Sequence, residues 1–349
     1  MTWREITAAQ LNNLRRPLIV DVRSPGEHAA ENIVGAINIP LLSNEERATV
    51  GTIYAQQGEL VARRQALGII APKIPEIIET IVTLRATGQA IVIHCWRGGL
   101  RSEAVASMLS VVGIDCFRLS GGYKSWRKQV LTDLQNNSYR FRPVVLHGLT
   151  GVGKTVILQE LRALSFSVLD LEQLANHRGS AFGGMGLEAQ PTQKNFEAAL
   201  WQQLRSFDNE LVFMEAESRK IGKLALPDCT IQWIRTGQRL LVTSEIETRC
   251  ARIIADYAGA LNDNERQQAI AQLLGLKERL GTQRVLEIQE MFLAGNLAHA
   301  VAALLLEYYD PLYSSQIEQA HPFELTVDGG LPRAAAQAIA QWARRNLAV

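Results

Sequence analysis

The segment at residues 148–155, GLTGVGKT, matches the pattern G-x-x-x-x-G-K-[ST] at every fixed position. An apolar run, VVLH at 144–147, comes directly before it, and an amphipathic segment, VILQELRAL at 156–164, follows. A buried strand, a glycine-rich loop and a helix in this order turn backbone N–H groups toward one point, which is typical of a loop that binds phosphate. Because such a loop is built at the end of a parallel strand, an α/β fold is predicted around it.

The residues of this loop have different predicted roles. Backbone N–H groups and the Lys154 side chain are expected to hold a diphosphate or triphosphate, whereas the Thr155 hydroxyl is expected to ligate Mg²⁺. A second apolar run, LVFME at 211–215, would deliver the Glu215 carboxylate to the same metal, but an ordinary buried strand with a charged end fits this run equally well. The predicted phosphate-binding residues are Gly148, Gly151, Val152, Gly153, Lys154 and Thr155.

Two further segments have the composition of binding loops. One is EAESR at 215–219, and the other is HRGSAFGG at 177–184, which combines charged residues with glycines. Loops supply binding residues more often than the elements that they connect. We therefore predict contacts near the phosphate site from Glu215, Glu217, Ser218, Arg219, His177 and Arg178.

The chain is long enough to bury two cores of ordinary size, since it has 349 residues and 47% hydrophobic content. The polar stretch QNNSYRFRP at 135–143 has the composition of a linker and places a boundary near 137–142. The prediction is a first domain at 1–137 and a second at 138–349.

Strand and helix patterns alternate in both predicted domains, as in α/β proteins with parallel sheets. Helix-forming residues dominate 43–78, which is predicted to be a helical insertion in the first domain, and 248–310, a predicted helical region of the second. The strand candidates are PLIVDVRS at 17–24, VGAINIP at 34–40, AIVIHC at 90–95, CFRL at 116–119, VVLH at 144–147, FSVLD at 166–170, LVFME at 211–215, RLLVT at 239–243 and FELTV at 323–327.

Cys95 ends one of these strand candidates and is followed by a glycine-containing loop and a predicted helix. At a helix N-terminus, backbone N–H groups and the helix dipole stabilise a thiolate or a bound anion, and nearby arginines add to this effect. A buried structural cysteine is the alternative, although such a residue rarely needs two glycines and two arginines directly after it. Cys95 is the predicted catalytic residue, and the predicted anion cradle consists of Trp96, Arg97, Gly98, Gly99, Leu100, Arg101 and Ser102.

The overall charge is close to balanced, with 36 Lys and Arg against 35 Asp and Glu, for a formal net charge of +1. No bulk field therefore recruits nucleic acid, and any RNA binding must use local basic clusters. The candidate clusters are Arg140/Arg142, Arg219/Lys220/Lys223 and Arg344/Arg345.

The four cysteines contain no C-x-x-C pair, and no Cys/His group has the spacing of zinc ligands. No structural metal is therefore expected, and a reducing compartment fits best. The first residues are polar, and no apolar run approaches the length of a membrane span. A cytoplasmic enzyme without a membrane partner is the expectation.

Three ordered segments, DVRSPGEHAAENIVGAINIP at 21–40, HCWRGGLRS at 94–102 and LSGGYKSW at 119–126, resemble a rhodanese domain. The resemblance implies that Cys95 carries a transferable chalcogen and that the loop amides hold its outer atom. In common rhodanese loops the arginine is one position nearer the cysteine, whereas five residues separate Cys95 from Arg101 here. The same C-x5-R spacing marks cysteine phosphatases, so a phosphatase remains an alternative.

The whole chain resembles the tRNA 2-selenouridine synthase family, in which a rhodanese-like parallel-sheet domain precedes a P-loop NTPase-like α/β domain with a helical C-terminal part. The matching segments are CWRGGLRS, NEERATVGTIYAQQG, HGLTGVGKT, HRGSAFGG, ESRKIG and YYDPLY. The resemblance implies that selenium from selenophosphate replaces sulfur at C2 of a wobble 2-thiouridine in tRNA. It also implies an S-geranyl-2-thiouridine intermediate made from geranyl diphosphate, and a selenophosphate-producing enzyme as a partner.

Two other readings remain open at this point. One is a cysteine phosphatase or sulfurtransferase domain fused to a nucleotide-binding, kinase-like domain, and the other is a non-catalytic sulfur carrier regulated by a nucleotide. The phosphate loop by itself suits ATP as well as geranyl diphosphate.

Overall fold

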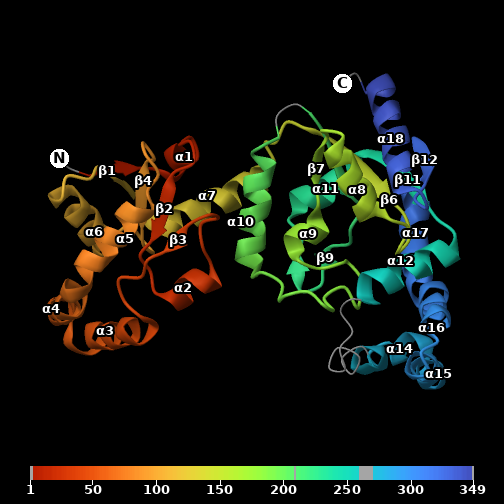
Figure 1. The fold of residues 1–349 in the computed structure, drawn as a ribbon, viewed down its shortest axis with the longest axis horizontal. Coiled ribbons are helices and arrows are strands. Elements are labelled where there is room, and N and C mark those ends of the chain that lie inside the picture. The colour runs from red at the N-terminus through yellow and green to blue at the C-terminus, as the bar shows by residue number, and fades with distance from the viewer. Residues whose placement is uncertain (1–2, 208–209, 259–269, 348–349) are drawn as a thin grey trace. The chain divides into compact units, whose positions relative to one another are not determined.

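A computed structural model of the chain describes residues 3–207, 210–258 and 270–347 (Figure 1). The chain forms two compact units. Unit 1 contains Met1–Asn136 together with Glu197–Trp201, and unit 2 contains Asn137–Phe196 and Gln202–Val349.

Unit 1 is built on a five-stranded sheet with the order β1-β5-β4-β2-β3, in which all neighbouring strands are parallel. The two central strands, β2 and β4, are buried along their whole length. Their sequences, LIVD and IVIH, are almost continuously apolar because helices cover both faces of a parallel sheet. The strands are β1 (Arg4–Ile6), β2 (Leu18–Asp21), β3 (Ile37–Asn38), β4 (Ile91–His94) and β5 (Phe117–Leu119).

The helices of unit 1 include the insertion that the sequence predicts at 43–78. Two helices, α3 and α4, fill most of it, and α5 continues as far as Leu84 because Ile77, Ile78 and Ile81 pack into the core under the sheet. The helical elements are α1 (Ala8–Leu11), α2 (Pro25–Ala30), α3 (Asn44–Gln57), α4 (Glu59–Ile70), the 3₁₀ turn η1 (Ala71–Lys73), α5 (Ile74–Leu84), α6 (Leu100–Val111) and α7 (Gly122–Asn136).

Unit 2 contains a second five-stranded sheet, with the order β12-β11-β6-β8-β7 and parallel pairing throughout. A short antiparallel hairpin, β9–β10, stands apart from this sheet. The strands are β6 (Arg142–His147), β7 (Ser167–Leu169), β8 (Leu211–Glu215), β9 (Lys220–Ile221), β10 (Leu224–Ala225), β11 (Gln238–Thr243) and β12 (Leu325–Asp328). The α/β fold class and the parallel sheets predicted from the sequence are confirmed.

The core of unit 2 lies between this sheet and the helices α8 and α18, which both contribute to one buried cluster with Val144, Phe213 and Leu240. A mainly helical part follows β11. The helices are α8 (Lys154–Ala163), α9 (Leu171–Ala175), α10 (Gln193–Leu204), α11 (Asp228–Thr236), α12 (Ile246–Ala258), α14 (Lys277–Leu280), α15 (Thr282–Leu293), α16 (Leu297–Leu304), the π-helical turn η2 (Leu305–Tyr309), α17 (Asp310–Ala320) and α18 (Pro332–Asn346).

The helical region that the sequence predicts at 248–310 corresponds to α12 through η2, and α17 extends it to Ala320. Residues 259–269 of that prediction lie outside the described residues. None of the helices in the described part of the chain is both long and apolar enough to cross a membrane.

Candidate functional sites

The phosphate loop connects β6 to α8 at the carboxyl edge of the unit 2 sheet. Gly148 has φ +153°, and a Cβ atom there would lie 2.4 Å from the carbonyl oxygen of Val242 on the neighbouring strand, so the loop needs glycine at this point. Gly153 adopts a left-handed conformation directly before α8. The Lys154 Nζ donates to the carbonyl oxygens of Gly148, at 2.8 Å, and Leu149, at 3.2 Å, and therefore lies over the loop.

A carboxylate that the sequence did not single out, that of Glu172, lies next to this loop. The Thr155 hydroxyl donates to Glu172 Oε2 at 2.9 Å, and the Glu172 backbone N–H donates to Glu215 Oε1 at 2.9 Å. Glu215, the predicted metal ligand, thus contacts the backbone of Glu172, which in turn contacts Thr155, and Glu215 is only 1% exposed. Its other oxygen, Oε2, has no hydrogen-bond partner among the described residues.

Several carboxyl groups share this end of the site, and their pKa values are raised. Burial, reinforced by the charges of Asp170 and Glu172, raises the pKa of Glu215 well above its usual value. Burial and the neighbouring Glu172 raise the pKa of Glu217 to about 8. Like charges close together in a desolvated site favour protonation, or a bound cation that replaces the protons.

The oxygen ligands needed for a divalent cation are present beside the phosphate loop. The Thr155 hydroxyl and the Glu172 carboxylate lie together, and Mg²⁺ in phosphate sites commonly takes one or two protein oxygens and completes its shell with phosphate and water. A group of three or more His, Cys, Asp or Glu residues suited to a metal does not occur in the described ranges. These residues fit Mg²⁺ held jointly with a phosphate ligand, and they do not form a metal cage.

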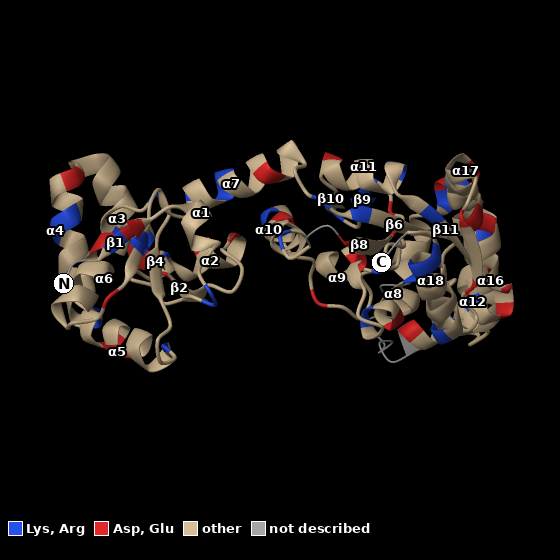
Figure 2. Cartoon of the chain, turned by 90° about the horizontal axis from the view of Figure 1, so that it is seen from above, with Lys and Arg blue, Asp and Glu red and all other residues tan. Residues whose placement is uncertain are grey.

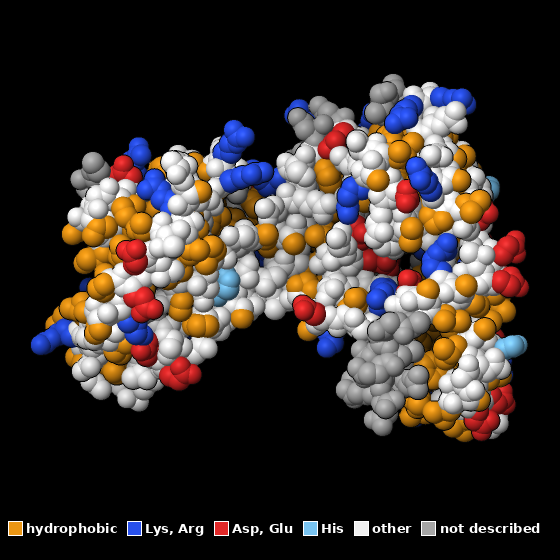
Figure 3. Space-filling model, viewed as in Figure 1, with side chains coloured by type: hydrophobic (Ala, Val, Ile, Leu, Met, Phe, Trp, Pro, Cys, Tyr) orange, Lys and Arg blue, Asp and Glu red, His pale blue; other side chains and the backbone are white. Residues whose placement is uncertain are grey.

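A cavity of about 430 Å³ opens from the phosphate loop. Its polar end includes Lys154, Thr155, Glu172, Arg178 and Glu217. The opposite wall is mostly apolar, although Arg252 and Asp256 of α12 also line the cavity. It comes from the helices after β11 and from the loop before α10, and its apolar and aromatic residues are Phe182, Met185, Ile253, Ile254, Leu273, Phe292, Leu297, Val301, Leu304, Leu305, Tyr309 and Tyr313. Figure 3 shows unit 2 hollowed between acidic and basic side chains, with hydrophobic side chains gathered over α14 and α15.

Two arginines of α12 connect the phosphate loop to the helical wall. Arg249 donates from Nε to the Thr150 carbonyl oxygen at 2.9 Å and forms two hydrogen bonds with the Asp310 carboxylate, at 2.6 and 3.0 Å. Arg252 donates to the carbonyl oxygens of Gly151, at 2.6 Å, and Gly329, at 2.8 Å. The position of the apolar wall is therefore tied to the conformation of the loop.

The predicted loop contacts divide into two groups. Arg178 and Glu217 line the cavity, and Arg178 is held by a hydrogen bond from Nη1 to the Met185 carbonyl oxygen at 2.8 Å. His177, Ser218 and Arg219 do not line it. Ser218 donates to the Lys220 carbonyl oxygen at 2.7 Å, and Arg219 is exposed, with Asp228 at 4.0 Å.

In unit 1, Cys95 lies directly after β4 and before the first turn of α6. Its side chain is 3% exposed, and its Sγ lies 3.3 Å from the Ser102 hydroxyl. Ser102 also donates to the Gly99 carbonyl oxygen at 3.0 Å, which fixes the hydroxyl beside the sulfur. The sulfur thus lies at a helix N-terminus, where backbone N–H groups favour a bound anion.

The turn at Gly121–Tyr123 packs against the cysteine loop. Gly122 has φ +59°, and a Cβ atom there would lie 2.3 Å from the Cys95 carbonyl oxygen, so only glycine permits this approach. The Tyr123 backbone N–H donates to the same carbonyl oxygen at 2.9 Å, and the Lys124 N–H donates to that of Trp96 at 3.0 Å. The Trp96 ring stacks on the Tyr123 ring with centroids 5.5 Å apart.

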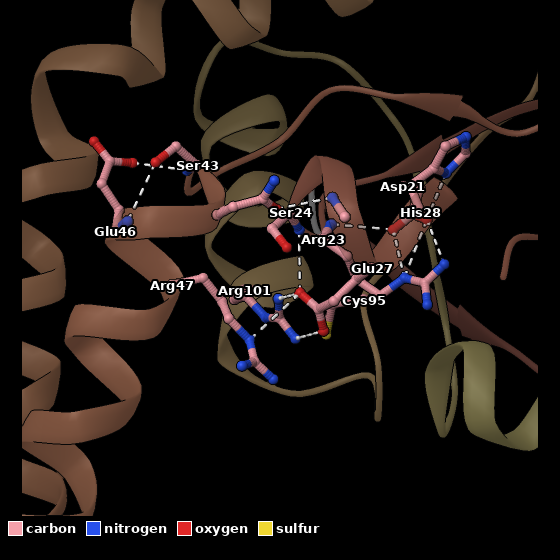
Figure 4. Close-up of polar contacts among 12 residues, drawn as sticks. Asp21, Arg23, Ser24, Glu27, His28, Ser43, Glu46, Arg47, Cys95 and Arg101 are labelled. Carbon is pink, nitrogen blue, oxygen red and sulfur yellow. Dashed lines mark hydrogen bonds and ion pairs between the residues drawn. The ribbon is translucent and has the colours of Figure 1, made fainter. Parts of the chain in front are cut away.

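The two arginines of the predicted cradle have different environments, and Figure 4 shows one of them, Arg101, beside Glu27. Arg97 and Leu100 are exposed. Arg101 forms two hydrogen bonds with Glu27 of α2, at 2.7 and 3.2 Å, and Glu27 also accepts from the Ser24 backbone N–H at 3.1 Å. The charge of Arg101 beside the loop is therefore balanced by a carboxylate that the sequence did not identify.

A buried ion pair lies behind the loop. Arg23 and Asp21 are both fully buried, with Nη2 and Oδ2 2.7 Å apart, and the guanidinium lies 4.4 Å from the centre of the Tyr123 ring. Burial opposes ionisation of Asp21, but Arg23 and His94 outweigh it and lower the pKa of Asp21 to about 2. Burial lowers the pKa of His94 to about 4, so this imidazole is neutral at pH 7.

Comparisons with known proteins give a family match for each of the two units. Residues 141–347 match the family model described as the tRNA 2-selenouridine synthase AAA domain, and residues 7–129 match the model of the rhodanese-like domain.

Curated relatives extend over most of the chain. A tRNA 2-selenouridine synthase of Shewanella denitrificans is 34% identical over 91% of this chain and 94% of its own length. The enzyme of the same name from a Sulfurovum strain is 33% identical over 88% and 90%. A solved structure of a rhodanese-related protein from Thermoplasma volcanium is 22% identical over 36% of this chain and 92% of its own, with a TM-score of 0.23.

Proposed function

This chain belongs to the tRNA 2-selenouridine synthase family, and we propose that it replaces sulfur by selenium at C2 of a wobble 2-thiouridine in two steps. In the first step, the unit 2 cavity binds geranyl diphosphate and the thiocarbonyl sulfur is geranylated. In the second, the Cys95 loop of unit 1 delivers selenium from selenophosphate to the geranylated base.

The observation that carries this proposal is the combination of a phosphate loop and an apolar wall in one cavity. The phosphate loop alone suits a nucleotide equally well, but a base and ribose need several polar partners, and the cavity beyond the loop is lined mainly by Leu, Ile, Val and Phe side chains. A ten-carbon prenyl chain needs only apolar contact. At about 0.8 kcal/mol per buried methylene, such a chain contributes up to about 8 kcal/mol before the ordering costs of binding.

The polar end of the cavity suits the departure of diphosphate. The thiocarbonyl sulfur attacks C1 of the geranyl group, the bond from C1 to the diphosphate oxygen breaks, and the proton on N3 of the base is released to water. The Lys154 ammonium group is positioned to exchange its hydrogen bonds with the Gly148 and Leu149 carbonyl oxygens for contacts with the departing diphosphate. Mg²⁺ held at Thr155 and Glu172 would neutralise charge that develops on the same group.

Geranylation prepares the base for selenium. A thiocarbonyl sulfur is a poor leaving group, whereas the S-geranyl sulfur departs as a thiol when a selenium nucleophile attacks C2. Hydrolysis of the P–Se bond of selenophosphate leaves phosphate and supplies hydrogen selenide as the nucleophile. Its attack forms the C2–Se bond and breaks the C2–S bond; the selenide proton moves to N3, and the departing geranyl thiolate takes a proton from water. Cys95, at the helix N-terminus beside Ser102, is the group through which the selenium is delivered.

A phosphatase at the Cys95 loop is less well supported, despite the C-x5-R spacing. Hydrolysis of an alkyl phosphate needs a general acid for the leaving alcohol. Among the described groups next to the loop, Glu27 has a lowered pKa because its hydrogen bonds and charge contacts with Arg101 outweigh its burial, and His94 is neutral at pH 7. Neither of these side chains holds an acidic proton at neutral pH.

The test is nucleoside mass analysis of a tRNA that carries 2-thiouridine. Incubation of the protein with geranyl diphosphate and selenophosphate should convert this nucleoside to 2-selenouridine, and omission of selenophosphate should leave S-geranyl-2-thiouridine. If 2-selenouridine forms equally fast without geranyl diphosphate, the geranyl step is wrong. If ATP or GTP is consumed instead and no nucleoside changes mass, the cavity serves a nucleotide.

A further inference from the structure

The fold separates the basic clusters of unit 2 between opposite edges of its sheet. All five strands are parallel, so every strand begins at one edge and ends at the other. Arg142 begins β6, and its Nη1 donates to the Leu347 carbonyl oxygen at 2.6 Å, which brings the end of α18 to the same edge. Arg140 precedes this strand, and Arg344 and Arg345 lie in the last turn of α18.

The phosphate loop lies at the other edge, after the last residue of β6. At about 3.3 Å per residue, the length of β6 separates it from the Arg142 edge by roughly 15–20 Å. The cavity therefore opens away from the cluster formed by Arg140, Arg142, Arg344 and Arg345.

The third cluster, Arg219, Lys220 and Lys223, belongs to the cavity edge. It follows β8 directly: Ala216 and Glu217 line the cavity, and Arg219 begins the turn into β9, two residues further on. All three side chains are exposed, and Figure 2 shows basic residues on the β9–β10 hairpin. The ammonium groups of Lys220 and Lys223 have no hydrogen-bond or ion-pair partner among the described residues.

The hairpin is fixed to the loop that lines the cavity. The Gln190 side chain accepts from the Lys223 backbone N–H at 2.8 Å and donates to the carbonyl oxygens of Ile221 and Ala175, both at 3.1 Å. The His177 ring lies against Gly222 and Gly183, since Cβ atoms at those glycines would be 2.9 and 2.7 Å from it. Arg178, next in sequence, lines the cavity. Exposed cations are therefore held in a defined position beside the cavity.

We propose that the β9–β10 hairpin, through Arg219, Lys220 and Lys223, binds the phosphate backbone of the substrate RNA and presents the target base to the unit 2 cavity. This inference rests on the proposed function. A base can react in the cavity only if the phosphates next to it come to the same edge of the sheet. Cations at that edge position the RNA, while the opposite cluster is out of reach of those phosphates.

The test compares two triple variants of the full chain with equal loss of charge. The hairpin variant is Arg219→Gln/Lys220→Gln/Lys223→Gln, and the control variant is Arg140→Gln/Arg344→Gln/Arg345→Gln. The dissociation constant for a tRNA carrying 2-thiouridine is measured over a range of salt concentrations. Binding of geranyl diphosphate without RNA is measured on the same preparations to verify that the cavity is intact.

Each phosphate contact to a single-stranded loop contributes about 0.7 to the slope of log affinity against log salt. Loss of three contacts should lower this slope by about 2 and weaken tRNA binding up to roughly 50-fold at 0.15 M salt. The control variant should bind tRNA within about threefold of the unaltered chain. Both variants should bind geranyl diphosphate normally.

Equal tRNA affinities for the hairpin variant and the unaltered chain, or a larger loss in the control variant, would overturn the proposal while leaving the proposed function intact. Failure of the unaltered chain to modify the tRNA would instead reject the proposed function. The two failures are separated by nucleoside mass analysis of the unaltered chain in the same experiment.

Discussion

Leu297 and Val301 offer a direct way to measure what the apolar wall contributes to binding. Both line the cavity, and they lie four residues apart on α16, so they share one face of that helix. Both are half-buried, which means that a prenyl chain would cover apolar surface that water otherwise contacts. The double variant Leu297→Ala/Val301→Ala shortens the two side chains by five carbons in all.

The size of the effect follows from that surface. Five carbons fully transferred from water would contribute up to about 4 kcal/mol, and because the two side chains are already partly covered we expect about half of this on binding. A loss of about 2 kcal/mol corresponds to roughly 30-fold weaker binding of geranyl diphosphate. Inorganic diphosphate does not reach the wall, so its affinity should change by less than about twofold.

Titration calorimetry with geranyl diphosphate and inorganic diphosphate separates these outcomes. The matched control is Leu286→Ala/Leu293→Ala, because these leucines of α15 are 44% and 70% exposed and do not line the cavity. The control should bind both ligands as the unaltered chain does. Equal weakening of both ligands in the wall variant, or unchanged affinity for geranyl diphosphate, would refute the role of the wall as a prenyl site.

Three further changes test separate parts of the two sites. Lys154→Ala should weaken geranyl diphosphate and inorganic diphosphate alike, by at least about tenfold in calorimetry, because it removes a charged contact to the diphosphate; unchanged affinity for both would contradict the phosphate-loop assignment. Glu27→Gln should free Arg101 to bind anions and so lower the inhibition constant of inorganic phosphate in the selenium step several-fold. The control Glu46→Gln, which alters a carboxylate paired with Lys73, should leave this constant unchanged. Equal inhibition constants in the two variants would show that Glu27 does not restrain Arg101. The pKa of Glu217 is raised to about 8, so the folded chain binds this proton more tightly than the unfolded chain and loses stability as pH rises from about 4.5 to about 8. In denaturant unfolding, Glu217→Gln should remove that loss at pH 8 and leave the stability near pH 4.5 unchanged. An identical pH dependence of stability in both proteins would disprove this prediction.

Local patterns were sufficient to predict the two loops. The residues of GLTGVGKT and CWRGGLRS are consecutive, and each needs only the strand before it and the helix after it to form. The parallel sheets followed from the same alternation of apolar runs and helical segments. In these cases the information lies within about twenty residues.

The parts not predicted depend on contacts between distant segments. Glu172 reaches Thr155 because the chain after β7 passes the end of β8, where the Glu172 backbone N–H donates to Glu215, and β8 lies beside β6; no spacing in the sequence relates Glu172 to Thr155. Glu27 and Arg101 are separated by 74 positions. The apolar wall combines buried and half-buried residues from several helices, and each helix alone resembles an ordinary amphipathic helix. Helical patterns showed that these segments fold, but their shared cavity is a product of tertiary packing.

The central claim is that geranylation and selenium transfer occur at separate sites, and the variant Cys95→Ser tests it most directly. Serine keeps the size of the side chain beside Ser102 but cannot form a thiolate. The measurement is nucleoside mass analysis of 2-thiouridine tRNA with geranyl diphosphate and selenophosphate both present. We predict that 2-selenouridine disappears while S-geranyl-2-thiouridine accumulates. Formation of 2-selenouridine at the original rate would show that Cys95 does not deliver selenium, and loss of both products by a folded variant would contradict the division into two sites.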